Sequence, residues 1–110
     1  MSAPFHSSLM RPASVKLAAA LSNTNFSTPS MPVYNNIDVA VESDPARIRD
    51  ALVRQLYRPV RWTESVQALA GQGVTRLIEC GSGAVLAGLA ALVPVRRAMR
   101  VDPIHALRAD

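Results

Sequence analysis

Apolar residues recur at helical spacing in the first half of the chain. Between residues 8 and 21 they fall at every fourth position, at Leu9, Ala13, Leu17 and Leu21. This period predicts an amphipathic helix over residues 8–21. A second stripe is formed by Ile48, Leu52 and Leu56. It follows Ser43-Asp44-Pro45, a typical helix start, and we expect Pro59 to end this second helix.

The second half alternates between helical and strand-like stretches. We expect Thr63 to cap a third helix, which Gly71 or Gly73 closes. Residues 74–80 are typical of a strand, and residues 84–92 predict a fourth helix after a tight glycine turn. Helices and a strand therefore alternate along the second half of the chain.

Short β-like segments lie between the first two helices. They cover residues 32–34 and 37–41, with Asn35-Asn36 between them as a turn signal. The order of elements predicts an α/β protein. Its sheet is expected to be incomplete, because two strands are marginal alone and the apolar helix stripes need more sheet to pack against. We expect a structured region over residues 1–92 and a basic, weakly patterned tail over residues 93–110.

Composition excludes several classes of protein. Hydrophobic residues make up 49% of the 110 residues, too many for a disordered chain. The net charge of +4 and a sequence pI of about 10.2 invite a nucleic-acid function. However, the arginines of the second helix alternate with Asp44 and Asp50, and aromatic residues make up only 5% of the chain. These features argue against nucleic acid as a partner.

The sequence also bears on location and ligands. The longest apolar run, residues 83–95, is shorter than the roughly 20 residues that a membrane span needs. No secretory signal is visible, so we expect a cytoplasmic protein without a membrane partner. An organelle transit peptide is a weaker alternative, because no acidic residue precedes Asp38. With one cysteine and two distant histidines, we expect no disulfide and no metal site.

The glycine turn Gly81-Ser82-Gly83 is the first candidate for chemistry. It lacks the spacing of a nucleophile elbow or a phosphate loop, so Ser82 is predicted to cap the following helix. Cys80 is predicted to be a buried strand residue, and His105 lies in the tail without a supporting pattern. His6 precedes the first helix and has the chemistry of a general base. Taken alone, a structural or surface histidine is the simpler interpretation.

Four segments together resemble one enzyme family. They are residues 4–10 (PFHSSLM), 26–39 (FSTPSMPVYNNIDV), 50–66 (DALVRQLYRPVRWTESV) and 73–89 (GVTRLIECGSGAVLAGL). In this order and spacing they are similar to the C-terminal part of malonyl-CoA:acyl carrier protein transacylases. The resemblance covers residues 3–92 and implies an α/β-hydrolase-like large subdomain, of which this chain would be one portion.

The resemblance implies a ping-pong acyl transfer without a cofactor. In the family, a serine takes malonyl from malonyl-CoA and passes it to the pantetheine thiol of an acyl carrier protein, which would be the partner of this chain. His6 would be the general base and acid. Gln55 would orient it through its backbone carbonyl.

The sequence departs from the family at the residues that carry the acyl group. The nucleophile motif G-H-S-x-G is absent, and so is the arginine that pairs with the malonyl carboxylate. Ser82 and Ala84 stand where the family usually has proline and lysine. The isolated chain is therefore expected to be inactive, because a base without its nucleophile cannot form an acyl-enzyme. The alternative is a non-catalytic module that docks onto a chain carrying the serine.

Overall fold

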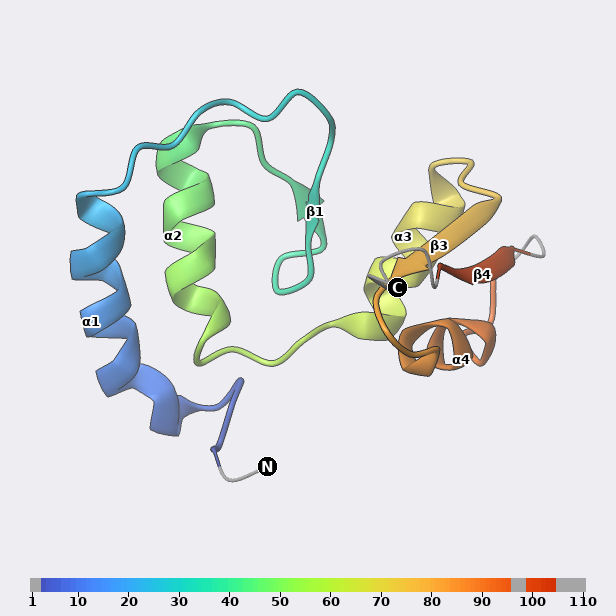
Figure 1. Cartoon of the computed structure of the whole chain (residues 1–110), viewed down its shortest axis with the longest axis horizontal. Helices are drawn as coiled ribbons and strands as arrows, with labels where there is room; N and C mark the ends of the chain where they lie inside the picture. Colours follow the sequence, from blue (N-terminus) through green and yellow to red (C-terminus); the bar gives the residue numbers. More distant parts are fainter. Residues whose placement is uncertain (1–2, 96–98, 105–110) are drawn as a thin grey trace, which may run out of the picture. The chain divides into compact units, whose positions relative to one another are not determined.

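The computed structural model describes residues 3–95 and 99–104, which form two compact units with a division after Arg61. Unit 1 begins with a 3₁₀ turn, η1 (Ser8–Met10), which leads into helix α1 (Arg11–Ser22). Strands β1 (Tyr34–Asn35) and β2 (Ala40–Val41) and helix α2 (Pro45–Gln55) follow. Helices α1 and α2 pack against each other (Figure 1). Both had been predicted from their apolar stripes.

A tight hairpin replaces the longer strand expected over residues 37–41. Strands β1 and β2 pair antiparallel, with Tyr34 opposite Val41 and Asn35 opposite Ala40. Residues 36–39 form the turn between them, and Ile37 is buried there. The prediction was wrong because Ile37 is apolar for packing and not for strand pairing. Ile37 and Ala51 of α2 are the buried apolar residues described in unit 1.

Helix α2 begins as its sequence predicts. The carboxylate of Asp44 accepts a hydrogen bond from the backbone N–H of Ala46, and Pro45 occupies the first helical position. The helix is assigned to end at Gln55, four residues before Pro59. This is the distance at which a proline ring clashes with a helical carbonyl.

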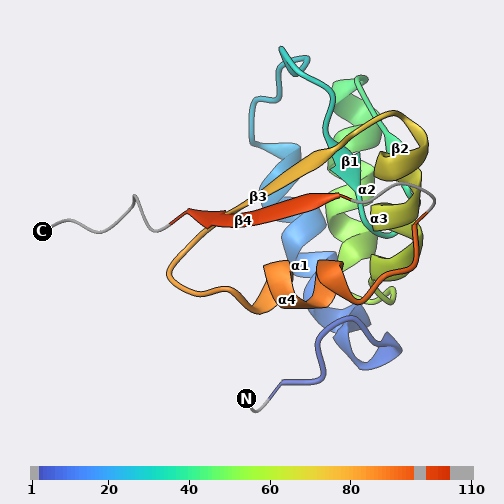
Figure 2. The same cartoon turned by 90° about the vertical axis from the view of Figure 1, so that its right-hand side faces the viewer.

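Unit 2 contains helix α3 (Trp62–Gly71), strand β3 (Arg76–Cys80), helix α4 (Val85–Ala91) and strand β4 (Arg100–Ile104). Strands β3 and β4 pair in parallel, from Arg76 opposite Arg100 to Cys80 opposite Ile104 (Figure 2). Helix α4 contacts both strands, and Val66 and Ala90 are buried. The structure is thus a mixed α/β fold with small sheets.

Two details of α3 differ in how well they were predicted. The helix begins at Trp62, so Thr63 lies inside its first turn and not at its cap. Its end was predicted correctly. Gly73 has a positive φ of 88°, and its N–H donates to Ala70 O while Val74 N–H donates to Leu69 O. This paired arrangement satisfies the last helical carbonyls and requires the left-handed backbone that glycine adopts readily.

Three further predictions for unit 2 need correction. Strand β4 lies within residues 93–110, which had been expected to lack a clear pattern. Its sequence, RVDPI, has a proline and two charged residues, so apolar alternation could not reveal it. Cys80 is exposed and not buried, because residues of β3 alternate between exposed and half-buried positions. Ser82 does not cap α4, as described below. His105 lies outside the described residues.

Candidate functional site

The candidate site lies where the chain before η1 meets the C-terminal end of α2. His6 Nδ1 lies 2.9 Å from the backbone carbonyl oxygen of Gln55, although 49 residues separate the two in sequence. The backbone N–H of His6 donates to the carbonyl of the next residue, Leu56, at 3.0 Å. The histidine is therefore held by two adjacent carbonyls through its ring and its main chain.

These bonds define the tautomer of the neutral imidazole. A backbone carbonyl can only accept, so Nδ1 carries the proton and Nε2 has the free lone pair. The His6 residue is exposed, and no described residue makes a hydrogen bond to Nε2. An oriented imidazole with an open Nε2 can accept a proton from a hydroxyl or thiol.

The backbone at His6 is unusual and has a clear cause. His6 has a positive φ of 60°, which is uncommon for a residue with a side chain. Hydrogen bonds among the residues on either side of His6 hold its backbone in this conformation. Ser7 Oγ donates to Pro4 O at 2.7 Å, and Met10 N–H donates to Ser7 O at 3.0 Å. The left-handed conformation lets the main chain and the ring of one residue both face α2.

A charged clamp fixes the hairpin turn to the same end of α2. Arg54 donates two parallel hydrogen bonds of 2.8 Å to the carboxylate of Asp38 in the turn, and its Nε donates to Asp50 at 2.7 Å. This bidentate geometry gives strong and directional pairing. It holds the turn, in which Val39 has a strained positive φ of 55°. No pattern in the sequence indicated that Arg54 pairs with Asp38 in the turn.

The pairing of Arg54 with Asp38 should make the stability of unit 1 depend on pH. Hydrogen bonds from Arg54 hold the pKa of Asp38 below its ordinary value of 3.8, against a smaller opposing effect of burial. The charges of Arg54, Arg58 and Arg61 act in the same direction. The clamp therefore stabilises unit 1 fully above pH 3.8 and is lost as the pH falls through the lowered pKa.

Carbon-13 NMR of the Asp38 carboxyl group should show this shift directly. In the Arg54→Gln chain we expect the midpoint to rise toward 3.8, because the two short hydrogen bonds are gone. Arg47→Gln is the matched control on the same helix, since Arg47 lies 3.9 Å from Glu42 and its side chain is 75% exposed. Equal midpoints in the parent and Arg54→Gln chains would contradict the clamp.

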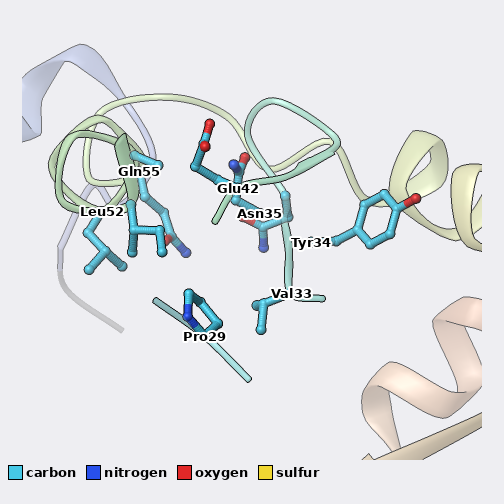
Figure 3. A pocket seen from close by; sticks show the side chains of 10 residues that line it. Pro29, Val33, Tyr34, Asn35, Glu42, Leu52 and Gln55 are labelled. Atoms are coloured by element: carbon cyan, nitrogen blue, oxygen red, sulfur yellow. The ribbon is translucent and has the colours of Figure 1, made fainter. Parts of the chain in front are cut away.

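A mostly apolar pocket of about 290 Å³ borders the site in unit 1. Its walls come from the loop before β1, the hairpin and α2, and Figure 3 shows the side chain of Gln55 among them. Gln55 thus has two separate roles in the structure: its backbone carbonyl holds His6, and its side chain lines the pocket. The other labelled residues are Pro29, Val33, Tyr34, Asn35, Glu42 and Leu52.

A residue that sequence reasoning missed lies at the start of α4. The N-cap residue Ala84 has no side-chain hydrogen bond to the helix. Instead, the carboxylate of Glu79 in β3 accepts from the N–H groups of Leu86 at 3.2 Å and Ala87 at 2.8 Å. A negative charge is favourable at this end of a helix. Glu79 thus supplies the cap that had been predicted for Ser82, from a strand residue that no capping pattern would identify.

The described residues form neither a metal site nor a membrane-spanning helix. In the described parts of the chain, no group of three histidine, cysteine or acidic residues is arranged to hold a metal ion. No helix built from these residues is long and apolar enough to cross a membrane. Tyr57 packs under the guanidinium of Arg11, whose central carbon lies 4.3 Å from the centre of the tyrosine ring.

Comparisons with known proteins agree with the resemblance seen in the sequence. The chain is 57% identical over 89 residues to a malonyl CoA-acyl carrier protein transacylase of Salmonella typhimurium, and 44% identical over 89 residues to one of Bacillus subtilis. Each alignment covers 81% of this chain but only 29% and 28% of the relative. A comparison with models of known protein families finds no match.

Solved structures give the same result. The chain matches an acyl carrier protein S-malonyltransferase from Vibrio cholerae with a TM-score of 0.89 and 46% identity, over 94% of this chain and 33% of that one. It matches a malonyl-transacylase in complex with a type II PKS acyl-carrier protein equally well, with a TM-score of 0.89, 45% identity and the same coverage.

The fold is therefore that of part of an acyltransferase. This chain is homologous to a part of the malonyl CoA-acyl carrier protein transacylases, and it spans about 29% of the length of the curated relatives it matches.

Proposed function

We propose that this chain supplies the general base of a malonyl-CoA:acyl carrier protein S-malonyltransferase. The observation that carries the proposal is the pairing of His6 Nδ1 with the Gln55 carbonyl, which leaves Nε2 free. Kinship with malonyl transacylases supports the reaction, and a relative bound to an acyl-carrier protein supports a carrier protein as partner. The rest of the sheet, of α/β-hydrolase type, would come from the part of the enzyme that this chain does not contain.

The proposed reaction uses Nε2 of His6 twice. It first takes the proton of a serine hydroxyl while the serine oxygen attacks the thioester carbonyl of malonyl-CoA, and it returns this proton to the departing coenzyme A thiolate. It then takes the proton of the carrier pantetheine thiol, whose sulfur attacks the malonyl-serine ester. The serine oxygen leaves and recovers the proton. No cofactor is required in either half.

The nucleophile must come from outside these 110 residues. The sequence has no G-H-S-x-G motif, and no arginine in a position that the resemblance assigns to the malonyl carboxylate. We therefore expect the isolated chain to transfer no malonyl group. The serine-bearing portion would be equivalent to the part of a full-length relative that this chain does not match.

A radiolabel experiment tests this proposal. The purified chain is incubated with labelled malonyl-CoA and acyl carrier protein, alone or with the portion of the Salmonella relative that lies outside the matched 89 residues. We expect no label on the chain alone and transfer to the carrier protein in the mixture. Stoichiometric covalent label on the chain alone would overturn the proposal, because it would place a nucleophile here.

A second candidate is a non-catalytic module that binds a serine-bearing chain without completing a site. Large apolar side chains favour some form of docking, because Leu9, Val15 and Met31 in unit 1 and Val85 and Leu92 in unit 2 are 67% to 80% exposed. The same mixture separates the candidates. Capture of the serine-bearing portion without malonyl transfer supports the module, whereas capture with transfer supports the enzyme.

A further inference from the structure

We propose that Pro59 is a positioning residue, which keeps the Gln55 carbonyl available for His6 by withholding a competing backbone N–H. The inference concerns how the site is built and rests on the proposed role of His6. It begins from the C-terminal carbonyls of α2. In a continuing helix each carbonyl accepts from the N–H four residues ahead, so the partner of Gln55 O would be residue 59.

The helical path continues beyond the assigned end of α2. Leu56 has helical dihedral angles, with φ of −63° and ψ of −36°. The N–H of Arg58 donates to Arg54 O at 3.1 Å, which is the α-helical bond between residues four apart. The next bond of this ladder would join residue 59 to Gln55. Proline has no N–H, so this bond cannot form.

The carbonyls before this break are already used locally. Val53 O accepts from Leu56 N–H at 3.3 Å, and Arg54 O accepts from both Tyr57 and Arg58. The first two carbonyls beyond them are those of Gln55 and Leu56, and these are the two that His6 contacts at 2.9 and 3.0 Å. Carbonyls up to Arg54 therefore accept from N–H groups of the helix itself. From Gln55 onward, where Pro59 provides no N–H, the carbonyls accept from His6 instead.

Pro45 provides a matched control within the same helix. It lies at the first position of α2, where the N–H has no helical acceptor, so its replacement frees no competing donor for a carbonyl. Pro45→Ala and Pro59→Ala are the same chemical change at opposite ends of α2. The proposal requires that only the second affects His6.

The test is nitrogen-15 NMR of the imidazole in the full chain, at a pH well above neutrality. Signals of His6 are identified by their absence from a His6→Ala chain. In the parent we expect the Nδ1–H tautomer to dominate. In Pro59→Ala the new N–H competes for Gln55 O, and the population should move toward the Nε2–H tautomer that a neutral, solvent-exposed histidine side chain prefers in water.

Each outcome decides the proposal. Pro45→Ala should leave the tautomer unchanged, and far-UV circular dichroism should show equal or greater helix content in Pro59→Ala. The proposal is wrong if Pro59→Ala keeps the Nδ1–H tautomer, if Pro45→Ala produces the same change, or if helix content falls in Pro59→Ala. A parent chain without a dominant Nδ1–H tautomer would also overturn it. No substrate is used, so failure here is distinct from failure of the proposed reaction.

Discussion

Replacing His6 by alanine should lower malonyl transfer in the reconstituted mixture by about 10²- to 10⁴-fold, the range measured for loss of a positioned general base. The structure gives the reason. His6 presents an oriented imidazole with an open Nε2, and no other described histidine is available to replace it. The measurement is the initial rate of labelled malonyl transfer to the carrier protein, with the serine-bearing portion present in excess.

Two controls separate a loss of base from a loss of folding or docking. Arg47→Gln changes an exposed residue of α2 and should retain the parental rate. The His6→Ala chain should still bind the serine-bearing portion with parental affinity. Gln55→Ala should cost far less than His6→Ala, because His6 contacts the backbone carbonyl, which every residue has. A parental rate for His6→Ala would contradict the assignment of the base.

The His6–Gln55 pair shows where sequence reasoning needed help. No local pattern links two residues that are 49 positions apart, and a backbone acceptor leaves no mark on residue identity. The resemblance to a family predicted that these two residues interact, whereas the apolar periodicity predicted only the helices. Pro59 is the one part of this site with a physical signal in the sequence, since a proline at the end of an apolar stripe predicts freed carbonyls.

Failures of prediction in unit 2 share a different cause. Strand β4 pairs with β3 through main-chain groups that are far apart in sequence, and its polar residues hide it from a search for alternating apolar positions. Cys80 is exposed because burial depends on how much of the sheet is present, and β4 is the one neighbouring strand that the structure describes for β3. Local capping patterns predicted Ser82 because they consider only polar residues next to the helix in sequence. Glu79 instead lies before the glycine turn, and its carboxylate contacts the first turn of α4.

Glu79→Ala should therefore weaken α4 by about 1–2 kcal/mol, the usual cost of losing a helix cap. The helix has only seven residues, and its two hydrogen bonds to Glu79 are the side-chain support described for its first turn. Isolated helices of this length are not stable in water, so α4 depends on its packing against β3 and β4 and on this cap. We expect the Leu86 and Ala87 amides to exchange roughly 5- to 30-fold faster.

Ser82→Ala is the matched control, because it removes the residue that the sequence pattern had chosen. Its side chain makes no cap hydrogen bond to α4, so exchange at Leu86 and Ala87 should stay within about twofold of the parent. Glu79→Gln should fall between the two, since an amide oxygen still accepts but the favourable charge at the helix N-terminus is lost. Faster exchange in Ser82→Ala than in Glu79→Ala would show that Ser82, and not Glu79, caps α4.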